Sequence, residues 1–505
     1  MAVSMSSDTL AAEELTKLQR IRLEKLARIR EQGVDPYPPR AVRTHTAAEA
    51  VELFQAAEAG DALDTLPGAL SLAGRLVSLR IMGRASFAHI QDGSGRIQIM
   101  MKQDALGEEA YRFFKEFFDL GDFIGVTGRL FRTRTGEITL EAHECQLLSK
   151  SLHPLPEKWH GLKDTELRYR QRYLDLITNE QTRHIFQLRS RIVTAMRQYL
   201  DEQGFMEVET PALQPLYGGA AARPFITHYH ALDQEVYLRI SDELYLKRLI
   251  IGGIDKVYEI CKDFRNEGLS TRHNPEFTMM ECYWAYADYN DVMQLVENMV
   301  AAIARQALGT EEITHQDKKV VLTPPWGRVT MRDAIQEITA IDIEAHPTLA
   351  ELQAAIKARK LAVNAQPTWA KLVDELFSEY VEPTLIQPTF IIDYPVELSP
   401  LAKRKPDAPH LVERFEAFAG GLELGNAFTE LNDPLDQRAR FEAMREQFAA
   451  GDEEAHPLDE DFLTAMMYAM PPTGGLGIGV DRLVMLLTNQ SSIREVILFP
   501  QLRTR

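Results

Sequence analysis

The hydrophobic pattern of residues 70–148 alternates with a period of two, and glycine-containing turns interrupt it. LAGRLVSLRIMG and SFAHIQDGSGRIQIMM place an apolar side chain at about every second position, as half-buried strands do. DGSG (92–95) and RTGE (134–137) have the composition of hairpin turns. About five short strands in so compact a stretch predict a Greek-key barrel of the OB type.

Before and after this stretch, helical periods prevail. They predict a helix over residues 9–32, ended by Gly33, and another over residues 182–203, ended by Gly204. Farther along, strand-like runs follow one another through hairpins rather than in strict β–α–β alternation, and two helical stretches between residues 348 and 380 interrupt them. This order predicts a mainly antiparallel sheet flanked by helices, so the fold class is α+β.

A chain of 505 residues is too long for a single hydrophobic core. The changes of pattern predict four regions. They are an N-terminal helix with its lead-in (1–69), the OB-type barrel (70–150), a linker (151–180) and an α+β domain (181–505) with a helical insertion at about 345–383.

Composition describes an ordinary globular protein, with 45% hydrophobic and 26% charged residues. No apolar run approaches the roughly 20 residues that span a bilayer, and the N-terminus lacks the basic and apolar regions of a secretory signal. The three cysteines are far apart without CxxC spacing, which argues against a disulfide framework or zinc site and indicates a reducing compartment. We therefore expect a cytoplasmic protein with no membrane association.

The formal net charge of −18 argues against a nucleic-acid partner, because phosphate binding needs a basic surface. A basic face on an acidic protein would nevertheless steer RNA to one side of it. Solvated helix faces explain basic clusters about as well. Two such clusters occur: Lys17, Arg20, Arg22, Lys25, Arg28 and Arg30 in the first helix, and Lys158, Lys163, Arg168, Arg170 and Arg172 near the linker.

Residues 258–286 predict a hairpin with unusual chemistry. Such a hairpin offers a guanidinium to a phosphate, an aromatic ring to a base, and a carboxylate with a phenol to a charged substrate. An exposed hairpin with a solvated loop is the plainer interpretation. With a period of two, one strand face carries Glu259, Cys261, Asp263 and Arg265, and one face of the next strand carries Phe277, Met279, Glu281 and Tyr283.

The chain contains neither a GxxxxGK[ST] phosphate loop nor a GxGxxG after a strand. Residues 474–479, GGLGIG, are glycine-dense but are followed by Asp481 and Arg482. Glycine-dense turns usually serve tight packing. Paired with Arg265, however, Arg482 can bracket a triphosphate from two sides, as in-line displacement at the α-phosphorus requires.

Together these motifs resemble a known family. FRNEG followed by RHNPEFTMME resembles the second signature motif of class II aminoacyl-tRNA synthetases, GLGIGVDRLVMLLT the third, and GFMEVETPAL the first. Connecting segments such as KWHGLKDTELRYRQRYLDLI and GLELGNAFTELND resemble the lysine-specific members. The resemblance runs from about residue 10 to the end of the chain. It implies a class II catalytic domain that forms homodimers through its first motif.

The resemblance implies sites for ATP and magnesium. Arg265 would contact the α-phosphate and the substrate carboxylate, Arg482 the γ-phosphate, and Phe277 would stack on adenine. Glu416 and Glu423 match the magnesium ligands, whose hard oxygens suit a cation bridged to phosphates; without the resemblance, Glu416 would pass for part of a solvated helix face. Further ATP-binding residues would be Glu267, Arg272, His273, Asn274 and Gly477.

The resemblance also implies a lysine pocket. An ammonium cannot be buried without compensating charge. In the aspartate- and asparagine-specific relatives, the position of Glu430 resembles an arginine, so a carboxylate at this position favours a cationic substrate. A period of two puts Glu423 and Glu430 on opposite strand faces, which a bulge at Gly425 would reconcile. The pocket would consist of Gly219 and Glu243 for the α-amino group, Arg265 for the carboxylate, and Glu281, Tyr283, Asn426, Phe428 and Glu430 for the side chain.

In the barrel, Phe87 and His89 fall on one strand face, and Gln98 alternates with isoleucines. An exposed Phe among polar residues suits stacking on single-stranded bases, with Gln98 reading a base edge, although such a Phe more often makes a domain contact. Arg80 and Glu137 match further anticodon-reading positions of the family.

The resemblance thus implies an enzyme that activates L-lysine with ATP and Mg2+, without a covalent enzyme nucleophile, and transfers it to tRNA(Lys). Three alternatives remain. A paralogue that lysylates a protein would lack the barrel. A catalytically inactive, RNA-binding homologue would lose the arginines or the acidic ligands. An aspartate- or asparagine-specific enzyme is opposed by Glu430.

Overall fold

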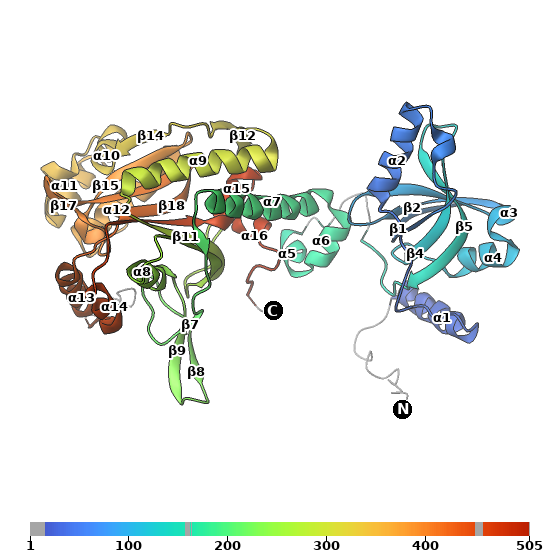
Figure 1. Ribbon diagram of the computed structural model, residues 1–505, viewed down its shortest axis with the longest axis horizontal. Coiled ribbons are helices and arrows are strands. Elements are labelled where there is room, and N and C mark those ends of the chain that lie inside the picture. Colours follow the sequence, from blue (N-terminus) through green and yellow to red (C-terminus); the bar gives the residue numbers. More distant parts are fainter. Residues whose placement is uncertain (1–15, 157–161, 163, 450–457, 504–505) are drawn as a thin grey trace. The chain divides into compact units, whose positions relative to one another are not determined.

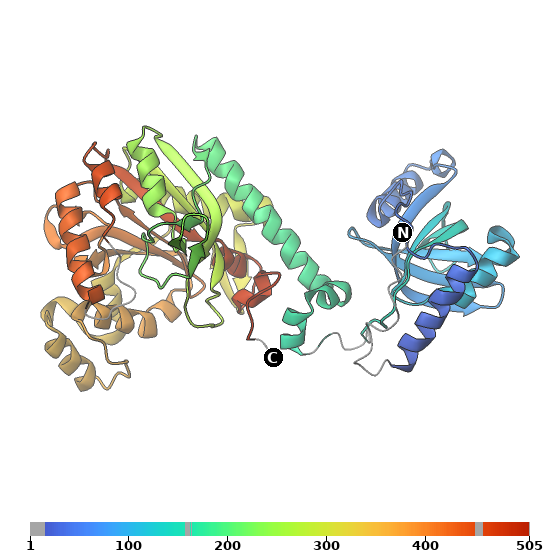
Figure 2. The same ribbon diagram turned by 90° about the horizontal axis from the view of Figure 1, so that it is seen from below.

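The computed structural model describes residues 16–156, 162, 164–449 and 458–503. The chain divides into two compact units, Met1–Gly161 and Leu162–Arg505, each with its own core (Figures 1 and 2). Among the helices of the described ranges, none has the length and apolar character that a membrane crossing needs. The predicted α+β class is confirmed, with a barrel in one unit and a large sheet with helices in the other.

The first unit is built on a closed barrel in the strand order β1-β2-β3-β5-β4, in which β4 pairs back onto β1. Alternate positions of each strand point into a core that contains Leu72, Ile90 and Ile99, which is the period-two pattern of the sequence. The strands are β1 (Leu70–Met82), β2 (Ala85–Gln91), β3 (Arg96–Lys102), β4 (Phe123–Arg132) and β5 (Ile138–Ser149).

Helices surround this barrel. Helix α1 (Lys17–Glu31) begins at a capping box between Thr16 and Gln19; residues 9–15 of the predicted helix lie outside the described residues. The sequence pattern missed α2 (Ala47–Ala59), α3 (Gln103–Leu106) and α4 (Glu108–Phe117), of which α4 contributes Phe114 and Phe117 to the core.

Several residues of the two basic clusters make contacts inside the fold, whereas others, such as Lys17 and Arg30, are exposed. A basic face that steers RNA therefore stays a prediction. Arg22 is buried and donates to the carbonyl oxygens of His153 and Leu120 at 2.7 and 2.9 Å, while Lys25 pairs with Asp119 at 2.7 Å. Other members of the clusters form ion pairs too: Arg28 pairs with Glu116, Arg168 with Asp175 and Glu495, and buried Arg172 with Asp175. Lys158 and Lys163 lie outside the described residues.

The second unit is built on a sheet in the order β14-β15-β17-β18-β19-β11-β10-β6, with β16 paired to β17. Neighbours are antiparallel except at β14–β15 and β10–β6. The strands are β6 (Met206–Glu207), β10 (Lys256–Phe264), β11 (Glu276–Ala285), β14 (Gly327–Thr330), β15 (Thr389–Pro395), β16 (Arg404–Lys405), β17 (Ala408–Ala419), β18 (Leu422–Thr429) and β19 (Thr473–Gly479).

Three helices cover one face of this sheet. α7 (Glu180–Glu202) and α9 (Tyr289–Leu308) lie side by side (Figure 1), and α15 (Val480–Leu487) joins them in one apolar core. The core takes the alternate, inward residues of the central strands, such as Phe415, Leu424 and Leu476. The opposite face of the central strands is therefore left to polar side chains.

The remaining elements extend the second unit. α10 (Met331–Thr339), α11 (Leu349–Ala358) and α12 (Trp369–Tyr380) form a separate core with the outer strands. The others are α5 (Thr165–Arg170), α6 (Arg172–Thr178), α8 (Glu243–Ile251), α13 (Pro434–Ala449), α14 (Glu460–Met466), α16 (Ile493–Val496), the small sheet β7 (Leu213–Gln214), β9 (Gln234–Leu238) and β8 (Ile226–Tyr229), and the hairpin β12 (Glu312–His315) with β13 (Lys318–Val321).

The register between β17 and β18 contains an irregularity. Ala417 pairs with Gly425, but the next residue, Phe418, pairs with Glu423, so Leu424 is the extra residue on β18. Leu424 turns into the helix-covered core, and Glu423 returns to the face that carries Asn426. The bulge thus lies immediately before Gly425 and places Glu423 on the polar face of the sheet.

Candidate active site

Along strand β19, every second residue from Gly475 to Gly479 is a glycine, and these glycines lie on the polar face of the sheet. The alternate residues, Leu476 and Ile478, are buried in the helix-covered core. We call Gly475, Gly477 and Gly479 the glycine stripe. The stripe lies between the side chains of two neighbouring strands: Gly475 pairs with Tyr283 and Phe428, Gly477 with Glu281 and Asn426, and Gly479 with Met279.

Carboxylate and phenol side chains meet over this stripe. Glu281 is buried and accepts hydrogen bonds from the hydroxyls of Ser241 at 2.8 Å and Tyr283 at 3.1 Å. Glu430, fully buried, follows the end of β18. The expected residues Glu281, Tyr283, Asn426, Phe428 and Glu430 are therefore brought to the same face of three adjacent strands.

Glu243 and Gly219, the two residues expected to bind the α-amino group of the substrate, also lie together. Glu243 begins helix α8 and is buried. Gly219 has φ +90°, and a Cβ on it would stand 2.7 Å from Ser241 Oγ and 3.0 Å from Glu243 Cβ. Only glycine therefore suits this position, by backbone angle and by space.

One residue that the sequence analysis missed lies among them. The ammonium of Lys247, which is fully buried, donates to Glu243 Oε1 at 2.5 Å and forms an ion pair with Glu430. It also lies 5.9 Å from the ring centre of Tyr283 and 5.8 Å from that of Phe428. The available signal was the Glu–Lys pair at i,i+4 spacing in ELYLK; its approach to Glu430 depends on the tertiary fold.

A second, acidic group was also missed. Asp242, Asp263 and Glu281 are buried, and each has a carboxylate oxygen within 4.8 Å of the others. Burial, with the charges of Glu281 and Asp263 adding to it, raises the pKa of Asp242 well above its ordinary value. Arg239 offsets part of this charge: it pairs with Glu259 at 2.7 Å and lies 3.5 Å from Asp263.

Each of the two predicted arginines contacts a residue expected at the nucleotide. Arg265 follows β10, and its guanidinium lies 5.0 Å from the ring centre of Phe277. Arg482, in the first turn of α15, pairs with Glu423 Oε2 at 2.6 Å and contacts His273 Nε2 at 3.2 Å. Motif residues far apart in sequence thus meet on the polar face of the sheet.

The other expected nucleotide residues belong to the loop between β10 and β11. Glu267 and Arg272 are exposed, and Arg272 pairs with Glu382. Asn274 is buried, donates to the Glu276 carbonyl oxygen at 2.6 Å and accepts from the Gln501 amide at 3.2 Å. Its side chain therefore fastens the end of the loop to the start of β11 and to the C-terminal segment.

Glu416 and Glu423 share the polar face, and Glu416 lies on strand β17 rather than on a helix. Tyr394 donates to Glu416 at 2.9 Å, and Arg414 pairs with it at 2.6 Å. Burial raises the pKa of Glu416 to about 7, with Arg414 opposing and Glu423 adding to the effect. Two carboxylates that repel each other in this way fit a bound divalent cation, which would relieve the repulsion.

On the barrel, the four predicted anticodon residues share one face. Arg80 pairs across the strands with Phe87, and Glu137 accepts a hydrogen bond from Gln98 at 2.6 Å and lies 2.7 Å from His89 Nε2. Phe87 is half-buried between the buried residues Ser86 and Ala88. His89, which also contacts Ser78 Oγ at 2.6 Å, was noted in the sequence but not included in the site.

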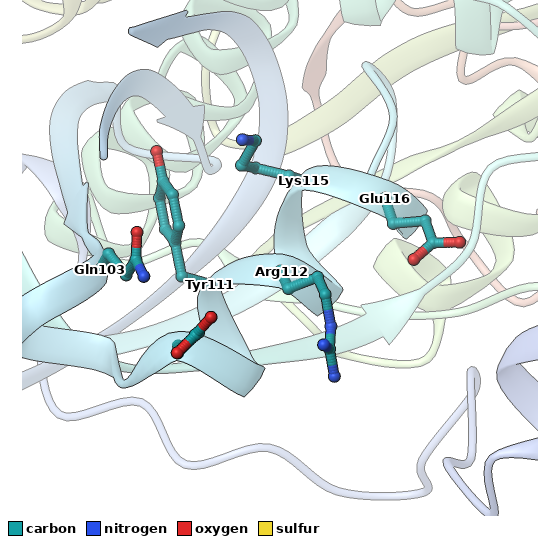
Figure 3. A pocket seen from close by; sticks show the side chains of 6 residues that line it. Gln103, Tyr111, Arg112, Lys115 and Glu116 are labelled. Atoms are coloured by element: carbon teal, nitrogen blue, oxygen red, sulfur yellow. The ribbon is translucent and has the colours of Figure 1, made fainter. Parts of the chain in front are cut away.

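A separate hollow of about 300 Å³ lies on the barrel unit beside α4 (Figure 3). Tyr111, in its wall, donates to the Gly83 carbonyl oxygen at 3.1 Å, and Lys115 lies 5.6 Å from the Tyr111 ring centre. Glu116 pairs with Arg28. These contacts assign the hollow a packing role between α4 and its neighbours.

Both units match families of known proteins. Residues 164–503 match the family of tRNA synthetases class II (D, K and N), and residues 70–148 match the OB-fold nucleic acid binding domain. The chain therefore belongs to the class II tRNA synthetases that carry an OB-fold domain.

Within that class, the chain is similar to several lysine--tRNA ligases. It is 57% identical over 493 residues to the lysine--tRNA ligase of Chloroflexus aurantiacus, covering 97% of this chain and 99% of that protein. It is 54% identical to that of Carboxydothermus hydrogenoformans (98% and 99% covered) and 51% identical to that of Bacillus subtilis (99% and 100% covered). It groups with the lysine--tRNA ligases over nearly its whole length.

Proposed function

We propose that this chain activates L-lysine with ATP and transfers the lysyl group to tRNA(Lys), with the residues above in the following roles. The single observation that carries the proposal is the meeting of three buried carboxylates: Glu281 and Glu430 lie over the glycine stripe, and Lys247 joins Glu430 to Glu243. Buried carboxylates need compensating cations, and the two ammonium groups of lysine supply them. Gly219 lies beside Glu243 at the α-amino end.

In the first step, a lysine carboxylate oxygen attacks the α-phosphorus of ATP. A P–O bond forms, the bond to the β-phosphate breaks, and pyrophosphate leaves. Arg265 holds the substrate carboxylate and the α-phosphate, so that charge building on the phosphorus is met by a fixed guanidinium. Arg482 holds the γ-phosphate, and Phe277 stacks on adenine while Glu267, Arg272, His273, Asn274 and Gly477 line the nucleotide site.

Magnesium is part of the proposal. Glu416 and Glu423 would hold the ion, which when bound neutralises phosphate charge. Arg482 pairs with one oxygen of Glu423. The same arginine thus positions the carboxylate and is placed to meet a phosphate.

In the second step, a hydroxyl of the terminal adenosine of tRNA attacks the lysyl carbonyl carbon, and AMP leaves.

We assign the catalytic domain to residues 181–505, with its insertion at 345–383, and anticodon recognition to the barrel (70–150). There, Phe87 stacks on a base, and Arg80, Gln98 and Glu137 contact base edges or phosphate. A cytoplasmic location, where tRNA is charged, belongs to the same proposal.

A homodimer is likewise proposed. The first-motif segment forms β6, the edge strand of the large sheet, and carries Met206 and Leu213 with 47% and 54% of their surfaces exposed. Apolar side chains at an unpaired edge favour contact with a second copy. Sedimentation equilibrium of the full chain tests this, and a monomer at micromolar concentration would contradict it.

The alternatives are disfavoured by particular features. A protein-lysylating paralogue lacks the barrel that this chain has. An inactive homologue would lose the arginines or the acids, and Arg265, Arg482, Glu416 and Glu423 are all present. An aspartate- or asparagine-specific enzyme would need a cation for its substrate at the position of Glu430.

The decisive experiment is ATP–pyrophosphate exchange with each of the twenty amino acids, followed by charging of tRNA(Lys). Exchange with lysine alone is expected. Exchange with aspartate or asparagine would overturn the pocket assignment, and exchange without tRNA charging would leave a protein substrate as the acceptor.

A further inference from the structure

The carboxylates of the amino-acid pocket already hold a cation of the chain itself. Lys247 Nζ lies 2.5 Å from Glu243 Oε1 and in an ion pair with Glu430. It is fully buried, so it cannot leave for solvent when a substrate enters. Tyr283 and Phe428 close its other sides, 5.9 and 5.8 Å from the ammonium to each ring centre.

The charge around the pocket is unequal without this lysine. Glu243, Glu281 and Glu430 together carry three negative charges when ionised, whereas a dibasic amino acid brings two ammonium groups. One internal ammonium makes these two counts equal. The neighbouring carboxylates Asp242 and Asp263, which lie beside Glu281, are outside this count, and Arg239 lies 3.5 Å from Asp263. The substrate carboxylate does not enter this count, because Arg265 is assigned to it.

The two oxygens of Glu430 have different surroundings. Lys247 pairs with Oε2 of Glu430, while Oε1 lies over Gly475 and has no hydrogen-bond partner among the described residues. Because Gly475 has no side chain, this oxygen occupies the space that a Cβ would fill, beside the Tyr283 ring. One oxygen of Glu430 thus faces the internal ammonium, and the other is left for a substrate.

We propose that Lys247 is a permanent counter-ion of the amino-acid pocket, which keeps Glu243 and Glu430 ionised and oriented so that they accept the two ammonium groups of a dibasic amino acid. This inference rests on the proposed function. Lys247 is a positioning residue: it acts on the substrate only through the two carboxylates.

Electrostatics supports this role. Burial raises the pKa values of Glu243 and Glu430, and the Lys247 ammonium opposes that effect in both. Burial also disfavours the charge on Lys247, but the two carboxylates outweigh it and raise the pKa of Lys247. The other charged group facing this trio is Glu281 from β11, with Asp242 and Asp263 beneath it.

The test replaces Lys247 with methionine, which keeps the length but not the charge, and compares Arg248→Met as a control. Arg248 is the next residue of α8 and pairs instead with Asp459 at 2.9 Å. We measure KM for lysine and for ATP in pyrophosphate exchange between pH 6.5 and 9. Loss of charge-assisted contacts predicts that Lys247→Met raises KM for lysine about tenfold or more, with KM for ATP within about twofold of the parent's.

The pH profile separates this role from a structural one. Without the ammonium, Glu243 and Glu430 protonate more readily, so KM for lysine in Lys247→Met should fall as the pH rises, whereas the parent and Arg248→Met should not show this added dependence. A folded variant with unchanged KM for lysine, a lower KM, or the parental pH profile overturns the proposal. Failure of the proposed function would differ: the parent itself would not exchange with lysine.

If Lys247→Met does not fold at pH 8, Lys247→Gln is used, with the same expectation. If neither folds at pH 8, the folded fraction of Lys247→Met is compared between pH 5.5 and 8. Recovery as the pH falls, when the two carboxylates protonate, supports the counter-ion role. Equal loss of stability at every pH overturns it.

Discussion

Oε1 of Glu430 lies over the α-carbon of Gly475, in the space where any other residue would carry its Cβ. The same Cβ would stand 2.6 Å from Cε1 of Tyr283. Gly475 is therefore required by the pocket rather than by a turn, since its backbone φ is not in the left-handed region. The third-motif glycine supplies the space in which the pocket carboxylate sits.

Gly475→Ala should displace Glu430 and weaken lysine use more than ATP use. Overpacking of this kind costs about 1–3 kcal/mol of folding stability. Loss of a charge-assisted contact through the displaced Glu430 costs about 1.5–3 kcal/mol, or about ten- to a hundredfold in KM for lysine. The measurement is pyrophosphate exchange with lysine or ATP varied. Gly474→Ala, whose Cβ would instead stand 2.6 Å from Val292 Cγ2, serves as the contrast: it should lower the melting temperature without a selective effect on lysine. Identical kinetics in the two variants would refute the assignment.

If Arg265 holds the α-phosphate as proposed, Arg265→Ala should lower lysine-dependent exchange about a hundred- to a thousandfold at saturating substrates, because the guanidinium would meet charge that develops in the transition state. Arg265→Lys should recover little, since a point charge cannot make bidentate contacts. Arg305→Ala, at an exposed surface pair with Glu311, controls for the loss of one positive charge. Robust exchange in Arg265→Ala would remove this residue from the mechanism.

Asp242→Asn should stabilise the second unit at high pH. The raised pKa of Asp242, caused by burial and then by the charges of Glu281 and Asp263, means that its contribution to stability is complete below its ordinary pKa of 3.8. That contribution is lost as the pH rises through the folded pKa, by about 1.4 kcal/mol for each pH unit that separates the folded pKa from the unfolded one. Asparagine does not titrate, so the variant should gain stability over the parent at pH 8 and not at pH 4.

Urea unfolding at pH 4, 6 and 8 measures this gain. Asp407→Asn, at an exposed turn, provides the matched control and should alter stability equally at the three values. A gain for Asp242→Asn that is independent of pH would show that Asp242 is not held as a buried acid.

The period-two pattern was sufficient to predict the barrel, the polar face of the β10–β11 hairpin and the shared face of Phe87 and His89, because one buried side fixes which residues alternate. It failed at β18. There a period of two separates Glu423 from Glu430, and the extra residue, Leu424, is visible only once β17 supplies the register.

Contacts between elements that are far apart in the sequence could not be predicted either. Lys247 lies on α8 and Glu430 follows β18, and neither local sequence predicts that the two side chains form an ion pair. Arg22 of the first helix shows the same limit: nothing in its local sequence predicts that it is buried and donates to the carbonyl oxygens of Leu120 and His153. Side-chain chemistry could be predicted from motifs, whereas its tertiary partners could not.

Phe87→Ala should separate the two activities of the molecule. If the barrel reads the anticodon, Phe87 contributes stacking on a base and nothing to adenylate formation. Exchange should stay unchanged while tRNA charging falls. Stacking on an aromatic ring is worth about 1–3 kcal/mol per base, which corresponds to about a five- to hundredfold loss in kcat/KM for tRNA. Phe123→Ala is the aromatic control. The Phe123 ring packs against Arg75, with 4.3 Å between the guanidinium and the ring centre.

The anticodon itself supplies a second test of the same contact. For a tRNA whose anticodon is already altered, Phe87→Ala should cost much less, because one contact cannot be lost twice. Equal damage to exchange and to charging would show that Phe87 maintains the barrel, whose strand β2 it shares with the buried residues Ser86 and Ala88. If Phe87→Ala charges tRNA as well as the parent does, other residues of the same barrel face recognise the anticodon. These are Arg80 and the hydrogen-bonded group of Gln98, His89 and Glu137.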